Sequence, residues 1–135
     1  MKHRGCEAEF VEERGLELLA AFRRVVLSVR RVSVREVAAA TVLLPCSRFW
    51  VSEERATAVV QALLRGQAAT ARMRPMKRAM FEEIHRRVAA MMADGRMGVA
   101  EAVRRVVYSP APCFYMAPGR AIDILYRMRK RGAGK

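Results

Sequence analysis

The chain repeats itself at a spacing of 65 residues. When the sequence is shifted by that distance, residues 96–121 align on residues 31–56 without a gap, and eight of the 26 positions are identical. Self-similarity at one fixed period predicts two units of the same fold, so the signals of one copy can be checked against the other. The identical pairs are Arg31/Arg96, Val34/Val99, Glu36/Glu101, Val42/Val107, Pro45/Pro110, Phe49/Phe114, Arg55/Arg120 and Ala56/Ala121.

Both copies have apolar residues at helical spacing and lack the period-two alternation of a strand. The second helix of each copy shows this at i, i+3, i+4, i+7 and i+8, starting at Val34 and at Val99. Ser33 and Glu36 predict a capping box at the first of these helices, and Gly98 is a tolerated cap for the second. The helices expected in chain order span about residues 7–28, 34–44, 53–65, 75–93, 99–109 and 118–131.

These signals predict an all-α protein of two tandem three-helix repeats. We expect residues 1–66 to form the first repeat and residues 75–135 the second, more basic one. Residues 67–74 are interpreted either as a linker or as an extension of the preceding helix. A leading helix followed by a helix, a turn and a third helix is the outline of a helix-turn-helix domain. The turn here is about seven residues long, which is longer than the usual connection, so the repeats are helix-turn-helix-like.

The turns are the best-preserved part of the repeat, at residues 45–52 and 110–117. The sequence leaves two roles open for Trp50 and Tyr115, packing between helices or stacking on a base or ribose. Both segments resemble a Pro-Ala-Pro-Arg-Phe-Tyr-Val-Ser element carried twice by small proteins from phages and mobile elements of gut bacteria. The resemblance covers about residues 30–132 and implies no activity. The second copy has Cys113 where the element, like Arg48 in the first copy, has arginine.

Charge is the main functional signal. The formal net charge is +13, with 22 arginines among the 26 basic residues, and residues 67–135 hold 15 basic against five acidic side chains. Such a surplus indicates a polyanionic partner, nucleic acid before an anionic membrane surface or an acidic protein. The residues expected to contact nucleic acid are Arg48, Trp50, Arg72, Arg74, Lys77, Arg78, Arg86, Arg87, Arg104, Arg105, Tyr115, Arg127, Arg129, Lys130 and Arg131.

Two matched pairs suggest an ionic tie inside each repeat. Glu36 and Glu101 lie on the second helices, and Arg55 and Arg120 lie at the start of the third. A semi-buried bidentate pair between Glu36 and Arg55, and between Glu101 and Arg120, suits the arginine side chain. The alternative is that both arginines face phosphate.

Catalytic signals are missing. His3 and His85 are the only histidines, and the sequence has no zinc-protease motif, phosphate-binding loop or nucleophile elbow. We therefore expect no enzyme activity, no metal and no cofactor. The three cysteines lack a pairing pattern, and no apolar run is long enough for a membrane span, which favours a cytoplasmic protein without membrane contact.

Taken together, the sequence predicts a small basic protein that binds nucleic acid, with DNA, in particular duplex DNA, preferred over RNA. The alternative is a helical assembly or accessory protein that binds a protein partner or RNA, for example beside a reverse transcriptase or in a phage particle. That alternative includes a homo-oligomer.

Overall fold

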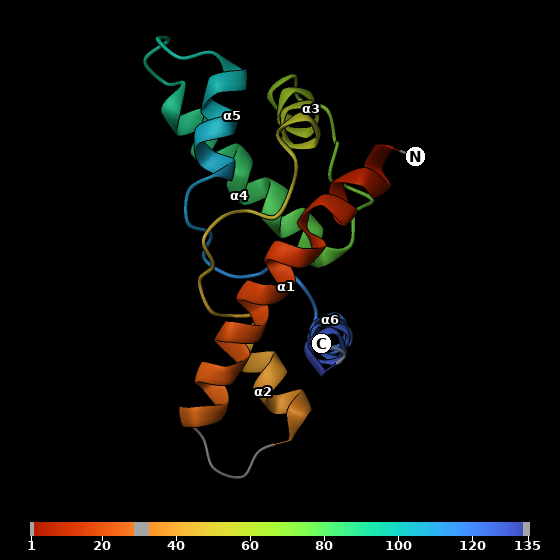
Figure 1. Ribbon diagram of the computed structural model, residues 1–135. Helices are drawn as coiled ribbons and strands as arrows, with labels where there is room; N and C mark the ends of the chain where they lie inside the picture. Colours follow the sequence, from red (N-terminus) through yellow and green to blue (C-terminus); the bar gives the residue numbers. More distant parts are fainter. Residues whose placement is uncertain (1, 29–32, 134–135) are drawn as a thin grey trace.

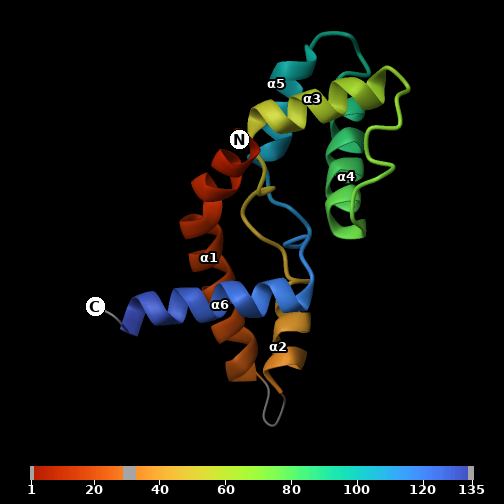
Figure 2. The same cartoon turned by 90° about the vertical axis from the view of Figure 1, so that its right-hand side faces the viewer.

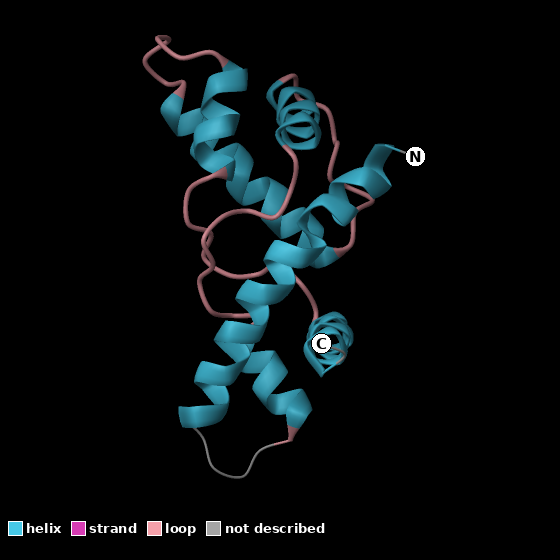
Figure 3. Cartoon of the chain, in the orientation of Figure 1, coloured by secondary structure: helices cyan, strands magenta, loops and turns pink. Residues whose placement is uncertain are grey.

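Local capping signals set the ends of the helices. The computed structural model describes residues 2–28 and 33–133, with side chains for residues 10–28 and 33–130. These residues form six α-helices and contain no strand (Figure 3). The helices are α1 (Lys2–Ser28), α2 (Val34–Thr41), α3 (Glu53–Leu64), α4 (Pro75–Met91), α5 (Val99–Val107) and α6 (Pro118–Ala133).

Most of the expected helix starts are confirmed. Ser33 caps α2 with the expected capping box, and the Ser52 side chain accepts a hydrogen bond from the backbone of Arg55 at the start of α3. Pro75 and Pro118 begin α4 and α6 as proline does at a first helical position. The start of α1 differs, because this helix already begins at Lys2.

Local backbone geometry ends helix α3 before residues 67–74. Gly66 follows α3 with a positive φ of 81°, a conformation that glycine adopts without strain. Its neighbour Gln67 donates a backbone hydrogen bond to the carbonyl of Ala62 at 3.0 Å, which closes the helix end. Helix α3 ends at Leu64, and residues 67–74 form turns that do not extend it.

The six helices pack as two groups of three. One group, which we call the α6 lobe, consists of α1, α2 and α6, and the other, the α4 lobe, consists of α3, α4 and α5. Figure 1 shows α3, α4 and α5 together at one end of the molecule, with α2 at the opposite end and α6 beside α1. Each third helix thus packs on helices that lie in the other half of the sequence.

Two extended segments cross between the lobes. They connect α2 to α3 and α5 to α6, and their chains run beside each other near the centre of Figure 1. The amide of Phe49 donates to the carbonyl of Val107 at 2.9 Å, and the amide of Phe114 donates to the carbonyl of Val42 at 3.0 Å. The two donors, Phe49 and Phe114, are 65 positions apart in the sequence, and the two acceptors, Val42 and Val107, are also 65 positions apart.

This crossing corrects the helix-turn-helix expectation. Helix α2 packs against α1 and α6, whereas α3 packs against α4 and α5, so α2 and α3 do not form a packed pair. The physical reason is the connecting segment, which is extended and bonded to the other crossing segment rather than folded into a tight turn. Three-helix packing is present, but each lobe draws its helices from both halves of the chain.

A single hydrophobic cluster runs through both lobes. Phe49 and Phe114, one from each crossing segment, are almost fully buried in it. The apolar stripes of α5 and α6 lie inward as expected, and burial of such side chains is the main source of stability. The ends of the α4 stripe differ from expectation, because Met76 and Met91 are exposed.

Candidate functional site

The outer face of α6 is strongly basic. Helix α6 holds five basic residues and one acidic residue, Asp123. Its apolar residues face α1 and α2, so the polar residues of the helix are directed outward. Tyr126, Arg127, Arg129 and Lys130 are all exposed. We call these four residues the α6 face.

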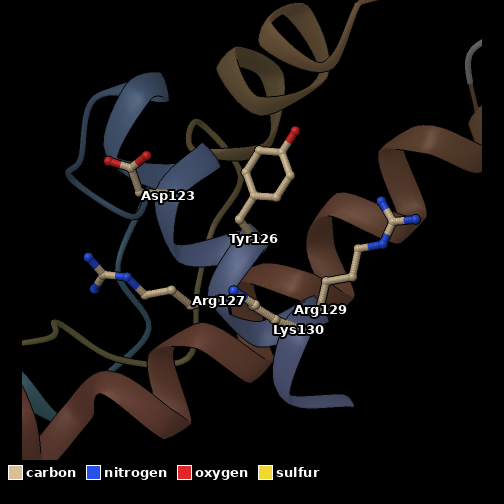
Figure 4. A pocket seen from close by; sticks show the side chains of 5 residues that line it. All are labelled: Asp123, Tyr126, Arg127, Arg129 and Lys130. Carbon is tan, nitrogen blue, oxygen red and sulfur yellow. The ribbon is translucent and has the colours of Figure 1, made fainter. Parts of the chain in front are cut away.

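The α6 face surrounds an open depression. Together with Asp123, its four side chains line a space of about 690 Å³. Figure 4 shows Arg127 and Arg129 extending on opposite sides of the helix, with the ring of Tyr126 standing between them and Asp123 one turn earlier. An exposed aromatic ring among cations is the combination that binds a base together with its phosphates. The side chain of Arg131, also expected here, lies outside the described residues.

Asp123 is the one carboxylate among the described residues that line this depression. Among the ion pairs of the described residues, none includes Arg127, Arg129 or Lys130. Tyr126, with 64% of its surface exposed, was not among the residues expected to bind. Its position gives a signal that could have identified it, since it lies on the polar side of the α6 stripe and is directly followed by Arg127.

The basic residues of α4 and α5 have a different environment. Glu82 pairs with Arg78, Glu83 with both Arg86 and Arg87, and Glu101 with Arg105, at distances between 2.6 and 2.9 Å. Four of the twelve clustered cations expected to meet phosphate are therefore already paired with a carboxylate. Arg72, Arg74, Lys77 and Arg104 are also exposed on or near the α4 lobe, and the ion pairs of the described residues do not include them.

Glu83 is held strongly by its two arginines. Hydrogen bonds from Arg86 and Arg87 lower its pKa from the ordinary 4.5 to about 2. Arg87 also donates to the carbonyl of Pro110 at 3.0 Å, and its guanidinium lies 5.0 Å from the centre of the Phe49 ring. Arg87 thus ties α4 to both crossing segments.

Arg48 has an internal role in this structure. Its guanidinium donates to the carbonyls of Phe49 and Val51 at 2.9 and 2.8 Å. The same group lies 4.3 Å from the ring centre of Phe10 and 4.5 Å from that of Tyr108. The donors and the flat face of the guanidinium are therefore engaged within the protein.

The two aromatic residues with open roles both pack internally. Trp50 is half-buried, with its ring 6.0 Å from that of Phe10. Tyr115 stacks on Phe49 at the same separation, and burial raises the pKa of its hydroxyl to about 12. Tyr115 has a φ of 54°, a strained conformation for a residue other than glycine. Of the two roles, packing is the one that these contacts fit.

Glu36, Glu101 and Arg55, which were expected to form ion pairs inside each repeat, contact other groups. The Glu36 carboxylate accepts from the backbone of Ser33 as part of the capping box, and Glu101 pairs with Arg105 on its own helix. The guanidinium of Arg55 lies 5.8 Å from the ring centre of Phe81 in α4. The physical reason is again the crossing, because α2 and α3 belong to different lobes.

Cys46 and Cys113 contact each other between the two crossing segments. Burial raises the pKa of the Cys46 thiol to about 12, and this thiol donates to the carbonyl of Cys113 at 3.3 Å. Among the described residues, no group of three or more histidine, cysteine or acidic side chains could hold a metal ion. None of the described helices combines the length and the apolar character needed to cross a membrane.

No protein-family model, curated protein or solved structure matches this chain.

Proposed function

We propose that this protein binds nucleic acid and that the α6 face is its principal contact. The observation that carries the proposal is the combination of three exposed cations with the exposed ring of Tyr126 on one helix. Within the part of the chain whose side chains are described, the ion pairs include none of these cations. Arginine and lysine neutralise phosphates and release counterions, and tyrosine offers a ring for stacking. DNA is the proposed partner, in preference to RNA.

The tandem-repeat architecture belongs to the same proposal. We infer two equivalent three-helix units whose third helices have exchanged places, which makes α6 the third helix of the α6 lobe. Support comes from the reciprocal bonds of Phe49 with Val107 and of Phe114 with Val42. Helix α6 carries the exposed cations of the α6 face, so α6 is the helix that would meet DNA.

The test is a salt titration of binding to a fluorescent DNA. In the variant Arg127→Gln/Arg129→Gln/Lys130→Gln, each lost phosphate contact is expected to reduce the slope of log affinity against log salt by about 1. The matched control is Arg35→Gln/Arg65→Gln/Arg96→Gln, which removes the same charge from exposed residues outside α6. Equal affinity of the two variants would contradict the proposal.

A second measurement isolates the tyrosine. Tyr126→Ala removes the ring, whereas Tyr126→Phe keeps it, so only the alanine variant should weaken binding, by roughly tenfold. Circular dichroism of both variants is the control that they are folded.

An assembly or accessory protein is the alternative function. The exposed Leu16 and Leu43 favour it, since a partner could cover them. Light scattering after nuclease treatment decides between the two: a homo-oligomer with no affinity for nucleic acid supports the alternative.

A further inference from the structure

Helices α1 and α6 are in contact where Gly15 faces the Met128 side chain. A Cβ atom built on Gly15 of α1 would lie 2.6 Å from the sulfur of Met128 in α6, so a larger residue at this position requires the Met128 side chain to shift. Figure 2 shows α6 crossing α1 and continuing past it toward the C-terminus. Beside the crossing lies a groove of about 390 Å³, formed by residues of both helices.

The groove joins an apolar floor to a cationic rim. Ile124 and Met128 are buried and form the floor together with the half-buried Val11. Arg14 from α1 and Arg120 from α6 lie on the rim and are half-buried. The rim is completed by two cations of the α6 face, Arg127 and Lys130.

This lining selects for a particular chemistry. A free phosphate would use the cations but has no apolar part to cover the floor. The backbone of a duplex presents phosphates too, but its bases remain stacked inside the helix. An unstacked nucleotide has both parts, a flat base for an apolar floor or a guanidinium plane and a phosphate for the rim. The volume of the groove is within the range of pockets for small ligands.

We propose that the α1–α6 groove takes one unstacked nucleotide of a single-stranded nucleic acid. The base lies on Val11, Ile124 and Met128, and its phosphate lies between Arg14 and Arg120. This inference rests on the proposed function, because the α6 face holds the neighbouring phosphates of the same strand through Arg127 and Lys130, which line both sites. It changes the expected preference from duplex to single strand.

The experiment compares a fluorescent oligothymidylate with a duplex of equal length at one salt concentration. The wild-type chain is expected to bind the single strand about tenfold more tightly than the duplex. In Arg14→Gln/Arg120→Gln this preference is lost, mainly through weaker binding of the single strand. The control Arg35→Gln/Arg65→Gln, which removes the same charge elsewhere, retains the preference.

A second variant covers the case in which the arginine variant does not fold. Val11→Trp places a large side chain in the groove from a half-exposed position, so it should remove the single-strand preference and leave duplex binding unchanged. Competition with inorganic phosphate separates the two sources of anion chemistry. If millimolar phosphate displaces the oligothymidylate from the wild type and Val11→Trp still binds the single strand as tightly as the wild type, the groove takes an anion without a base and the nucleotide assignment is overturned.

The outcomes for the two proposals are distinct. Equal wild-type affinity for single strand and duplex, with both weakened in the variant of the α6 face, overturns the groove assignment and supports the proposed function. If the variant of the α6 face binds both the single strand and the duplex as tightly as the wild type does, the proposed function itself is overturned.

Discussion

The amide of Cys46 donates to the carbonyl of Ala111 at 3.0 Å, and the amide of Ala111 donates back to the carbonyl of Cys46 at 2.9 Å. These two residues are 65 positions apart, so the bonds join two positions that the 65-residue shift of the sequence aligns. The pair forms an isolated antiparallel bridge between the crossing segments. It lies where the chain passes from one lobe to the other, and the packing of α3 and α6 follows from this crossing.

The first prediction concerns the linker at residues 67–74. Helix α3 packs on α4 and α5, and α6 packs on α1 and α2. Each half of the sequence therefore contributes one helix that packs against the other half. We expect a chain cut at a protease site placed between Gln67 and Ala68 to remain one particle in native size-exclusion chromatography. The two fragments should separate in denaturant. Separation under native conditions would show that the packing of α3 on α4 and α5, and of α6 on α1 and α2, does not hold the two halves together.

The second prediction separates a structural role of Arg48 from a binding role. Arg48→Met keeps the length of the side chain but removes two hydrogen bonds to carbonyls and the contacts of the guanidinium with the aromatic rings. The free energy of unfolding should fall by roughly 2 to 4 kcal/mol. Urea titration measures this, with the exposed Arg35→Met as the control.

Affinity for DNA provides the complementary readout for Arg48. Since its guanidinium is engaged inside the protein, the folded variant should bind DNA as the wild type does. A variant of normal stability with much weaker binding would instead assign Arg48 to the interface.

The local elements of this fold could be predicted because their causes are local. The caps at Ser33 and Ser52 depend on residues three positions away, and the proline at the start of α6 acts on its own backbone. The apolar stripes likewise show that each helix has a buried face. They do not show which helix covers that face, and two third helices with equivalent stripes can exchange places without any change in the pattern. The crossing was therefore beyond sequence reasoning.

The candidate site was predicted in part for a similar reason. The cluster of basic residues near the end of the sequence identified α6 as basic. Arg127, Arg129 and Lys130 of this cluster are exposed. Sequence gives no account of contacts between distant residues, such as the bond from Arg87 to the carbonyl of Pro110, 23 positions away. A cation that is held in this way looks the same in the sequence as one that faces solvent.

The third prediction follows from the lowered pKa of Glu83. Because the pKa of this carboxyl falls from 4.5 to about 2 on folding, its ionised form stabilises the folded chain. The contribution is complete above the ordinary pKa and is lost as the pH falls through the folded pKa. Glu83→Gln should therefore be less stable than the wild type near neutral pH, with the difference vanishing toward pH 2. Thermal unfolding across this range measures it.

The control for Glu83 is Glu13→Gln, a change at an exposed residue of α1. Its stability difference from the wild type should be small and should not vary in the same pH window. A Glu83→Gln difference that persists unchanged at pH 2 would rule out the ion pairs with Arg86 and Arg87 as its cause.

The last prediction tests the close crossing of α1 and α6. Glycine in a helix is usually replaceable, and a larger residue often stabilises because it restricts the unfolded chain. At Gly15 a side chain would meet Met128 at 2.6 Å, whereas at Gly119 of α6 a Cβ atom would have no neighbour within 4 Å. Gly15→Val should therefore lower the free energy of unfolding by about 1 to 3 kcal/mol, while Gly119→Val should not.

A compensating change identifies the cause of that loss. If Met128 is the obstacle, adding Met128→Ala to Gly15→Val should cost less than Met128→Ala costs in the wild-type chain, since the new valine fills part of the space that the methionine leaves. A double-mutant cycle by urea titration measures this coupling. Strict additivity of the two changes would mean that α1 and α6 do not meet at these residues, and the groove beside them would then lack the crossing that forms it.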